Sequence, residues 1–255
     1  RGGDKDFYTL EHYKHFLFGS AGSNNYFNVV DISVFFKTIF ISIIVTILNL
    51  LFCYPIAFYI AKVAQPNSAR FLIIALIIPF WINELLRSFA LRVLLANEGV
   101  INTFLTQIGL IDTGLLFITN NVGLYSGLTY AYLLLMMFPL YNAIESLDKN
   151  QLEAAKDLGS STFWTHIRVV IPHAKPGIVS GCTMVFMLTV GALATPVVLG
   201  GPNTLWFPEL IYQWFKMSNN WSRGAAYSFL LLIISVIFVL TMMRLFKVRI
   251  GEIIK

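Results

Sequence analysis

Hydrophobic positions gather into long runs along the chain, and polar residues fill the segments between them. Five runs are long enough to consider as bilayer spans of about 20 residues. They are residues 38–61, a run that begins at Phe71, and residues 122–144, 177–199 and 224–243. The runs are apolar on every face, which predicts helices rather than the alternating strands of a barrel. The second run differs because Asn83, Glu84 and Arg87 interrupt it. The pattern predicts an all-α membrane protein.

Composition supports a membrane protein and argues against several other classes. The chain has 255 residues, of which 57% are hydrophobic and 12% charged, about half the charged share of soluble domains. A disordered chain, a nucleic-acid-binding protein and a disulfide-stapled secreted protein are therefore poor fits. The net charge of +5 matches the Lys/Arg excess that membrane topology requires. Cys53 and Cys182 lie in separate apolar runs and are expected to be free thiols, and the four histidines lack zinc-site spacing.

Basic residues predict the orientation of the chain. Ten of them lie after the first run, after the third run or in the tail. They are Lys62, Arg70, Lys149, Lys156, Arg168, Lys175, Arg244, Lys247, Arg249 and Lys255. That side is therefore expected to be cytoplasmic. Five spans with an inner tail place Arg1 outside, so we expect a further span, a missing first one, before it.

The predicted organisation has three parts. Residues 1–33 form a periplasmic segment after that missing first span. Residues 34–248 form the transmembrane domain and include a cytoplasmic loop at 145–175, and residues 249–255 form a cytoplasmic tail. Two outer segments, 86–110 and 202–222, are amphipathic.

Aromatic residues are frequent in the second of these outer segments. They are Trp206, Phe207, Trp214, Phe215 and Trp221. Anchoring at the membrane interface is the favoured interpretation. A docking surface for an external partner is the alternative.

The loop between the third and fourth runs has the pattern of a helical hairpin. Residues 150–158 place Leu152, Ala155 and Leu158 on one face, which predicts a short helix. Gly159 fits the position just past its end. A second amphipathic turn follows at 163–170, and Pro172 and Pro176 are expected to end it before the fourth span. Such a hairpin suits a docking element that transmits force.

Ionisable groups inside the second run are costly in a membrane and therefore informative. Glu84 and Arg87 are three residues apart and could form a neutralising pair. Alternatively, Glu84 lines a translocation path with Trp81 and Asn83, where a cation would gain from the carboxylate and the aromatic face. Tyr125, Tyr130 and Tyr132 could add further aromatic faces, although packing is the simpler role for each. The stretch Gly191–Pro196 is expected to form a kink or gate.

The cytoplasmic loop resembles the EAA loop of permease subunits of ABC importers. The resemblance rests on Glu153-Ala154-Ala155, Gly159 and Val169-x-Ile171-Pro172. In that family the loop contains a coupling helix that sits in a groove of a cytoplasmic ATPase subunit. The resemblance implies a type I importer fold, with five core helices and usually one more at the N-terminus. It also assigns coupling to Glu153, Ala154, Ala155, Asp157, Gly159 and Pro172.

Further motifs make most of the chain similar to the first permease subunit of spermidine/putrescine importers. They are Ile78-Pro79-Phe80-Trp81-x-Asn83, Pro139-Leu140-Tyr141, Leu147-Asp148, Pro176-Gly177-Ile178 and Asn220-Trp221. The resemblance implies a multi-pass protein of the bacterial inner membrane with three kinds of partner. They are a second, different permease, an ATPase dimer and a periplasmic substrate-binding protein. One departure is Glu84, where a small or neutral residue is expected.

The chain itself contains no motif for nucleotide hydrolysis. It lacks Gly-x-x-x-x-Gly-Lys-Ser/Thr, the Gly-x-Ser-x-Gly elbow and the His-Glu-x-x-His pair. ATP and Mg are therefore expected in the partner ATPase, with no cofactor in this chain. The predicted cargo is a small organic cation, with polyamine favoured over a quaternary ammonium or sulfonium zwitterion. A stand-alone channel or secondary carrier is remoter because neither internal repeats nor a proton relay is evident, and an enzyme is remoter still.

Overall fold

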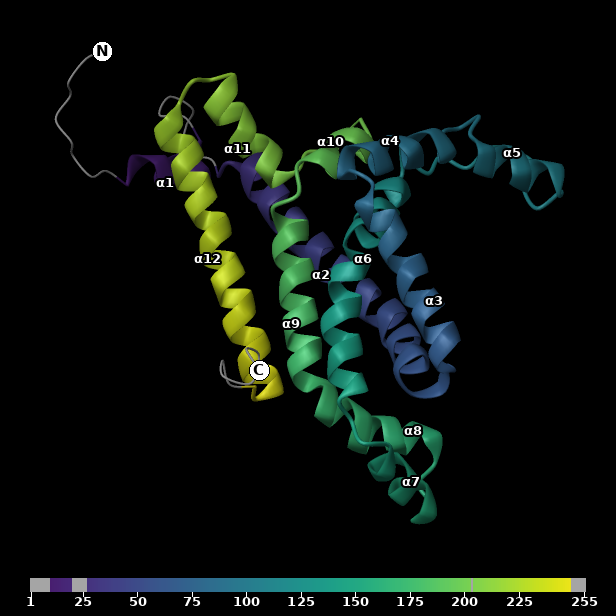
Figure 1. Ribbon diagram of the computed structural model, residues 1–255. Coiled ribbons are helices and arrows are strands. Elements are labelled where there is room, and N and C mark those ends of the chain that lie inside the picture. Colours follow the sequence, from purple (N-terminus) through teal and green to yellow (C-terminus); the bar gives the residue numbers. More distant parts are fainter. Residues whose placement is uncertain (1–9, 20–26, 203, 249–255) are drawn as a thin grey trace.

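The computed structural model describes residues 10–19, 27–202 and 204–248, and the regular elements in these ranges are all helices (Figure 1). The predicted tail at 249–255 and Arg1 lie outside the described residues. The loops expected to be cytoplasmic lie at one end of the bundle, together with the last turn of α12. The outer segments lie at the opposite end, called the outer end below. This arrangement agrees with the orientation predicted from the basic residues.

Four helices in the described ranges are long and apolar enough to cross a membrane. The first is α2 (Val29–Phe58), which continues as the π-helical η1 (Tyr59–Val63). The others are α6 (Val122–Glu145), the continuous stretch Thr162–Val190 and α12 (Trp221–Phe246). The first, third, fourth and fifth hydrophobic runs are thereby confirmed as helices.

The second run folds as a bent span. Its parts are α3 (Pro66–Ile77), the 3₁₀ turn η2 (Ile78–Trp81) and α4 (Glu84–Leu94), with a bend of 94°. Pro79 cannot donate a backbone hydrogen bond, which favours a break here. Asn83 then starts the new helix, because its side chain accepts a 2.8 Å hydrogen bond from the Leu85 N–H. The polar residues that interrupt the run therefore mark the bend.

The fourth span begins earlier than its sequence pattern indicates. It comprises α8 (Thr162–Thr165), η3 (His166–Val170) and α9 (Ile171–Val190). The expectation that Pro172 and Pro176 end the preceding turn was wrong. Pro172 follows the π-helical η3 directly, and Pro176 lies inside α9, so the helix continues through both prolines. The span also ends at Val190 rather than residue 199, and the short α10 (Ala194–Leu199) follows. The break between Val190 and Ala194 agrees with the kink expected in this stretch.

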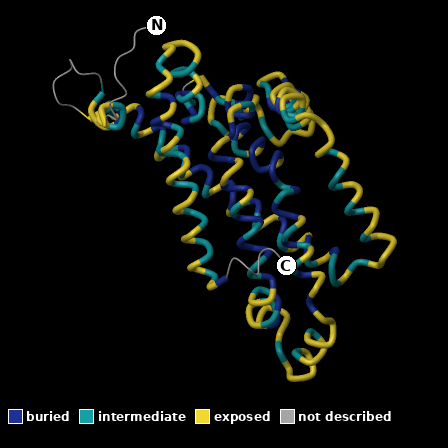
Figure 2. The backbone as a smooth tube through the Cα atoms, turned by 60° about the vertical axis from the view of Figure 1, so that its left-hand side comes forward, coloured by how far each residue is buried: buried dark blue, intermediate teal, exposed yellow. Residues whose placement is uncertain are grey.

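The core of the bundle lies between α6 and α9, with α2 packed against both (Figures 1 and 2). A Cβ atom at Gly177 would meet the Pro139 carbonyl and the Ala143 side chain. Small residues thus let α6 and α9 approach closely. By contrast, the apolar window of α12 is not buried within this chain, which leaves that helix free to face lipid or another subunit.

A second core lies at the outer end, between α1 (Glu11–Phe18), the start of α2 and of α12, and α11 (Phe207–Lys216). Trp206 and Phe207 are 0% exposed. The expectation of interfacial anchoring is therefore wrong for these two residues, because they fill the protein interior. Trp221 is 67% exposed and retains the exposure that an anchor needs. Cys53 and Cys182 are buried free thiols, as predicted.

Candidate functional site

The loop at 145–175, which is expected to be cytoplasmic, forms a hairpin that extends beyond the ends of the spans (Figure 1). Its first arm is α7 (Lys149–Asp157), which confirms the predicted helix at 150–158 to within one residue. Asp148 caps this helix by accepting a 3.0 Å hydrogen bond from the Asn150 N–H. Gly159 follows with φ +76°, a conformation that glycine adopts without steric cost. The hairpin therefore has a defined start and a sharp turn.

Large apolar side chains are exposed on this hairpin. Leu158 is 88% exposed, and Phe163 and Trp164 are also exposed. The guanidinium of Arg168 lies 4.5 Å from the centre of the Trp164 ring. Exposed apolar side chains in such a group are typical of an interaction surface.

The predicted coupling residues divide into two groups. Glu153, Ala154, Asp157 and Gly159 are exposed, and Ala155 is half-buried, all on or beside α7. Pro172 lies apart from them, in the first turn of α9. The structure thus places five of the six on the hairpin and one at its root.

The root of the hairpin contains contacts that sequence reasoning missed. Lys62 donates hydrogen bonds to the carbonyl oxygens of Glu145 and Leu147, and Tyr54 bonds His166. The residue types alone do not indicate these contacts. A lysine after a hydrophobic run is ordinary, and the positions paired here are 83 to 112 residues apart.

Glu84 lies at the first position of α4, where three elements meet. Its Oε1 accepts a 2.8 Å hydrogen bond from the Thr195 hydroxyl of α10 and a 3.3 Å hydrogen bond from the Tyr132 hydroxyl of α6. Ser88 and Thr195 are themselves joined by a 3.2 Å hydrogen bond. All of these partners are neutral, so they orient the carboxylate without neutralising its charge.

Glu84 and Arg87, both described, do not form the neutralising salt bridge that was the alternative expectation. Arg87 instead donates a 3.4 Å hydrogen bond to the Ala131 carbonyl oxygen. Its guanidinium lies 5.7 Å from the centre of the Phe80 ring and 5.8 Å from that of Tyr130. Aromatic faces and a carbonyl dipole thus receive this cation. Among the described residues, Glu84 is therefore left without a salt-bridge partner.

The remaining predicted path residues have different surroundings. Trp81 is 85% exposed and lies three residues before Glu84. Asn83 is occupied in capping α4, while Tyr130 is exposed beside Arg87. Tyr125 packs against the main core. The structure therefore groups Trp81, Asn83, Glu84 and Tyr130 around the bend and leaves Tyr125 in a packing role.

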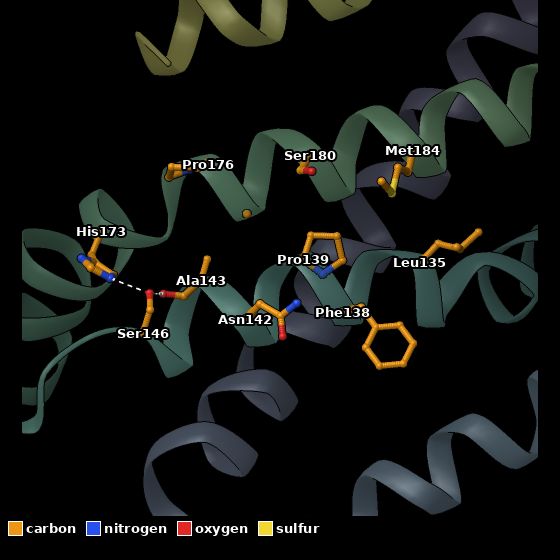
Figure 3. A pocket seen from close by; sticks show the side chains of 11 residues that line it. Leu135, Phe138, Pro139, Asn142, Ala143, Ser146, His173, Pro176, Ser180 and Met184 are labelled. Atoms are coloured by element: carbon orange, nitrogen blue, oxygen red, sulfur yellow. Dashed lines mark hydrogen bonds between the residues drawn. The ribbon is translucent and has the colours of Figure 1, made fainter. Parts of the chain in front are cut away.

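A cavity of about 700 Å³ lies between α6 and α9, nearer the hairpin (Figure 3). Polar groups gather at one end, where Ser146 and His173 share a 3.1 Å hydrogen bond near Asn142. Leu135, Phe138 and Met184 line the other end. Sequence reasoning missed this cavity, because it depends on how the two helices face each other. The described residues contain no group of three side chains suited to hold a metal.

Residues 32–250 match the family of binding-protein-dependent transport system inner membrane components. The chain belongs to this family. It is therefore an inner membrane component of a transport system, and its apolar helices are the spans of a permease. The permease is a subunit for transport rather than an enzyme.

Curated relatives agree with this assignment. The permease is 36% identical over 204 residues to the spermidine/putrescine transport system permease protein PotB of Haemophilus influenzae. This match covers 80% of this chain and 71% of the relative. It is also 36% identical over 215 residues to PotB of Escherichia coli strain K12, with 83% and 78% covered.

A solved structure supports the fold. The permease matches the crystal structure of a bacterial ABC transporter involved in the import of the acidic polysaccharide alginate. The TM-score is 0.71 at 18% identity, and the match covers 95% of this chain and 85% of that one. At this identity the likeness shows the fold alone, and the fold is that of a type I ABC importer transmembrane domain.

Proposed function

We propose that this permease carries a polyamine, such as spermidine or putrescine, across the inner membrane as part of an ATP-driven importer. The observation that carries the proposal is the Glu84 carboxylate, which two neutral hydroxyl groups hold at the bend, three residues after the exposed Trp81. An ammonium group would gain from both the charge and the aromatic faces. The PotB relatives support the same class of cargo.

The proposed importer has further subunits. An ATPase dimer binds ATP and Mg and docks on α7, where Leu158 and its neighbours are exposed. A second, different permease completes the membrane part, and a periplasmic substrate-binding protein delivers the polyamine. Closure of the ATPase dimer moves the hairpin and switches the path between outward and inward access, as a rigid-body transition.

A betaine-like zwitterion is the second candidate cargo, because the exposed Trp81 ring would also suit a quaternary ammonium group. Such a zwitterion carries a carboxylate of its own, however, and Glu84 would repel it. A polyamine has only positive groups, so the Glu84 site favours it. A stand-alone carrier is disfavoured because it would have no use for the exposed apolar hairpin.

The test is uptake of radiolabelled spermidine by cells that lack their own polyamine importers and express the whole transport system. We expect ATP-dependent uptake that excess putrescine reduces and excess glycine betaine does not. If only excess glycine betaine reduces the uptake, the favoured cargo would be the zwitterion and not a polyamine. No spermidine uptake from a correctly assembled complex would contradict the polyamine proposal.

A further inference from the structure

The cytoplasmic end of the first span touches both roots of the coupling hairpin. At the entry root, Lys62 of η1 donates a 2.9 Å hydrogen bond to the Glu145 carbonyl oxygen and a 2.5 Å hydrogen bond to that of Leu147. These carbonyls lie at and just after the end of α6, where backbone acceptors lack helical partners. An ammonium group there also complements the helix dipole. Lys62 thus fixes the chain just before α7 begins.

The exit root is held by a second contact from the same span. Tyr54 of α2 shares a 2.7 Å hydrogen bond with Nδ1 of His166, the first residue of η3. The Phe58 ring lies 4.3 Å from the His166 ring, centre to centre, at an angle of 62°. His166 follows α8 directly, so this contact fixes the chain where the hairpin returns to the membrane.

The end of the first span and the exit root of the hairpin are irregular in the same way. The stretches Tyr59–Val63 and His166–Val170 are π-helical, and single π-helical turns are frequent at functional positions. Pro55 lies within the last turn of α2 before the first of them. A cavity of about 360 Å³ borders the contact between Tyr54 and His166. On this side the hydrogen bond adds a directional contact to the packing of α2 against α9.

The other end of α2 is tied to the outer core. Asp31 accepts a 2.5 Å hydrogen bond from the Tyr227 hydroxyl of α12. The Thr38 hydroxyl oxygen accepts a 3.1 Å hydrogen bond from the Phe207 N–H of α11. One helix therefore joins the roots of the hairpin to the elements that close the outer end.

We propose that α2 transmits movement of the coupling hairpin to the outer end, with Lys62, Tyr54 and His166 as the positioning residues. None of the three needs to touch the cargo or the ATPase. The inference rests on the proposed function, because it assumes that an ATPase moves the hairpin. It goes beyond that function by assigning the transmission to the first span, in addition to the two spans that flank the loop.

The first test measures spermidine transported per ATP hydrolysed by the whole complex in proteoliposomes, together with the amount of ATPase that copurifies. Tyr54→Phe and Lys62→Gln should lower this ratio by about threefold to tenfold, the range expected for one or two lost hydrogen bonds. The ATPase should copurify as in wild type. Tyr59→Phe removes a hydroxyl from an exposed tyrosine five residues along the chain, and Lys62→Arg retains a donor, so both should keep the ratio within twofold.

A double variant tests whether Tyr54 and His166 act as a pair. Tyr54→Phe combined with His166→Phe should be no worse than either change alone, because each removes the same hydrogen bond. Additive losses would overturn the pairing. An unchanged ratio in Tyr54→Phe and Lys62→Gln, or a loss that follows loss of copurifying ATPase, would overturn the transmission role.

The second test does not depend on the cargo. Spin labels at the exposed positions Val63 and Gln151, introduced into the whole complex with Cys53 and Cys182 replaced, report the distance between η1 and α7. That distance should be the same in the nucleotide-free and vanadate-trapped complexes, and Tyr54→Phe should broaden its distribution. A distance in the otherwise unaltered complex that changes between the two states would overturn the inference. If spermidine transport fails while this distance stays fixed, the polyamine proposal fails and the transmission role stands.

Discussion

Thr195 donates a 2.8 Å hydrogen bond to the carboxylate of Glu84, which lies 111 positions earlier in the chain. The two residues belong to α10 and α4, short helices that each follow a break in a span. The hydrogen bond therefore joins two broken spans through a carboxylate that has no salt bridge to any of the described residues. A cationic cargo that binds Glu84 would compete with Thr195 for the same oxygen and loosen this connection.

The charge of Glu84 can be removed without losing its hydrogen bonds. In Glu84→Gln the amide oxygen can still accept from Thr195 and Tyr132, so the fold should persist. Uptake of spermidine should fall about tenfold, the effect of losing roughly 1.4 kcal/mol of attraction for the cation. The measurement is the initial rate of radiolabelled spermidine uptake at matched expression.

Glu98→Gln is the matched control, since it removes an exposed carboxylate after α4. It should leave uptake within twofold of wild type. Wild-type uptake by Glu84→Gln would show that the carboxylate does not contribute to cargo binding.

The turn at Gly159 can be tested against a second glycine with nearly the same backbone. Gly159 has φ +76° and Gly109 has φ +71°, and a Cβ atom added at either would meet nothing within 4 Å. Alanine at each position should therefore cost a similar amount, about 1 kcal/mol. Only Gly159→Ala should reduce ATP hydrolysis stimulated by the binding protein, because only Gly159 shapes the hairpin. Equal losses in both variants would indicate a general effect on folding.

Close packing of α6 against α9 depends on Gly177. A methyl group there would collide with the Pro139 carbonyl, which is backbone and cannot turn away. Gly177→Ala should destabilise the permease by about 1–3 kcal/mol, seen as a lower midpoint of thermal unfolding in detergent. Gly191→Ala, where the nearest atom is the Met187 carbonyl oxygen at 3.3 Å, should have a smaller effect. The reverse order would contradict the packing argument.

The outer core should respond to pH through His15. Burial and the nearby Arg223 lower the pKa of His15 below its usual 6.5; His12 acts in the same direction, and Asp31 partly offsets it. The folded state then resists protonation more than the unfolded chain. The contribution of neutral His15 to the stability of the fold is therefore fully present above about pH 6.5, and it is lost as the pH falls below that value.

Thermal unfolding in detergent between about pH 7.5 and about pH 5.5 checks this linkage. The midpoint should fall with pH in the wild type, and less steeply in His15→Gln. His173→Gln, near the start of α9 and bonded to Ser146, should keep the full slope. An unchanged slope in His15→Gln would contradict the role of His15.

Hydrophobic runs predicted the spans because a membrane helix must be largely apolar over its length. The basic residues predicted the orientation because they gather on the cytoplasmic side. They misplaced the start of the fourth span, because Pro172 in isolation indicates a helix end, whereas the helix continues through it after the π-helical η3. Sequence alone predicts an interfacial position for Trp206 and Phe207, because it cannot show that Trp206 packs in the main core and Phe207 in the outer core.

The candidate site was predicted in part for a similar reason. The hairpin is local in sequence, so its helix and its glycine turn could be recognised. The partners of Glu84 come from α6 and α10, and neither Tyr132 nor Thr195 can be paired with it by spacing. Arg87, three residues along the helix, was the partner that helical spacing predicted. It contacts two aromatic rings and a backbone carbonyl instead.

Polyamine-dependent ATP hydrolysis is the most direct test of the central proposal. The complete complex would be assembled in lipid nanodiscs with its cognate binding protein, and spermidine and glycine betaine would be titrated in parallel. The account predicts that spermidine stimulates hydrolysis and that glycine betaine does not. Stimulation by glycine betaine alone, or a response to neither in a complex that hydrolyses ATP, would contradict it.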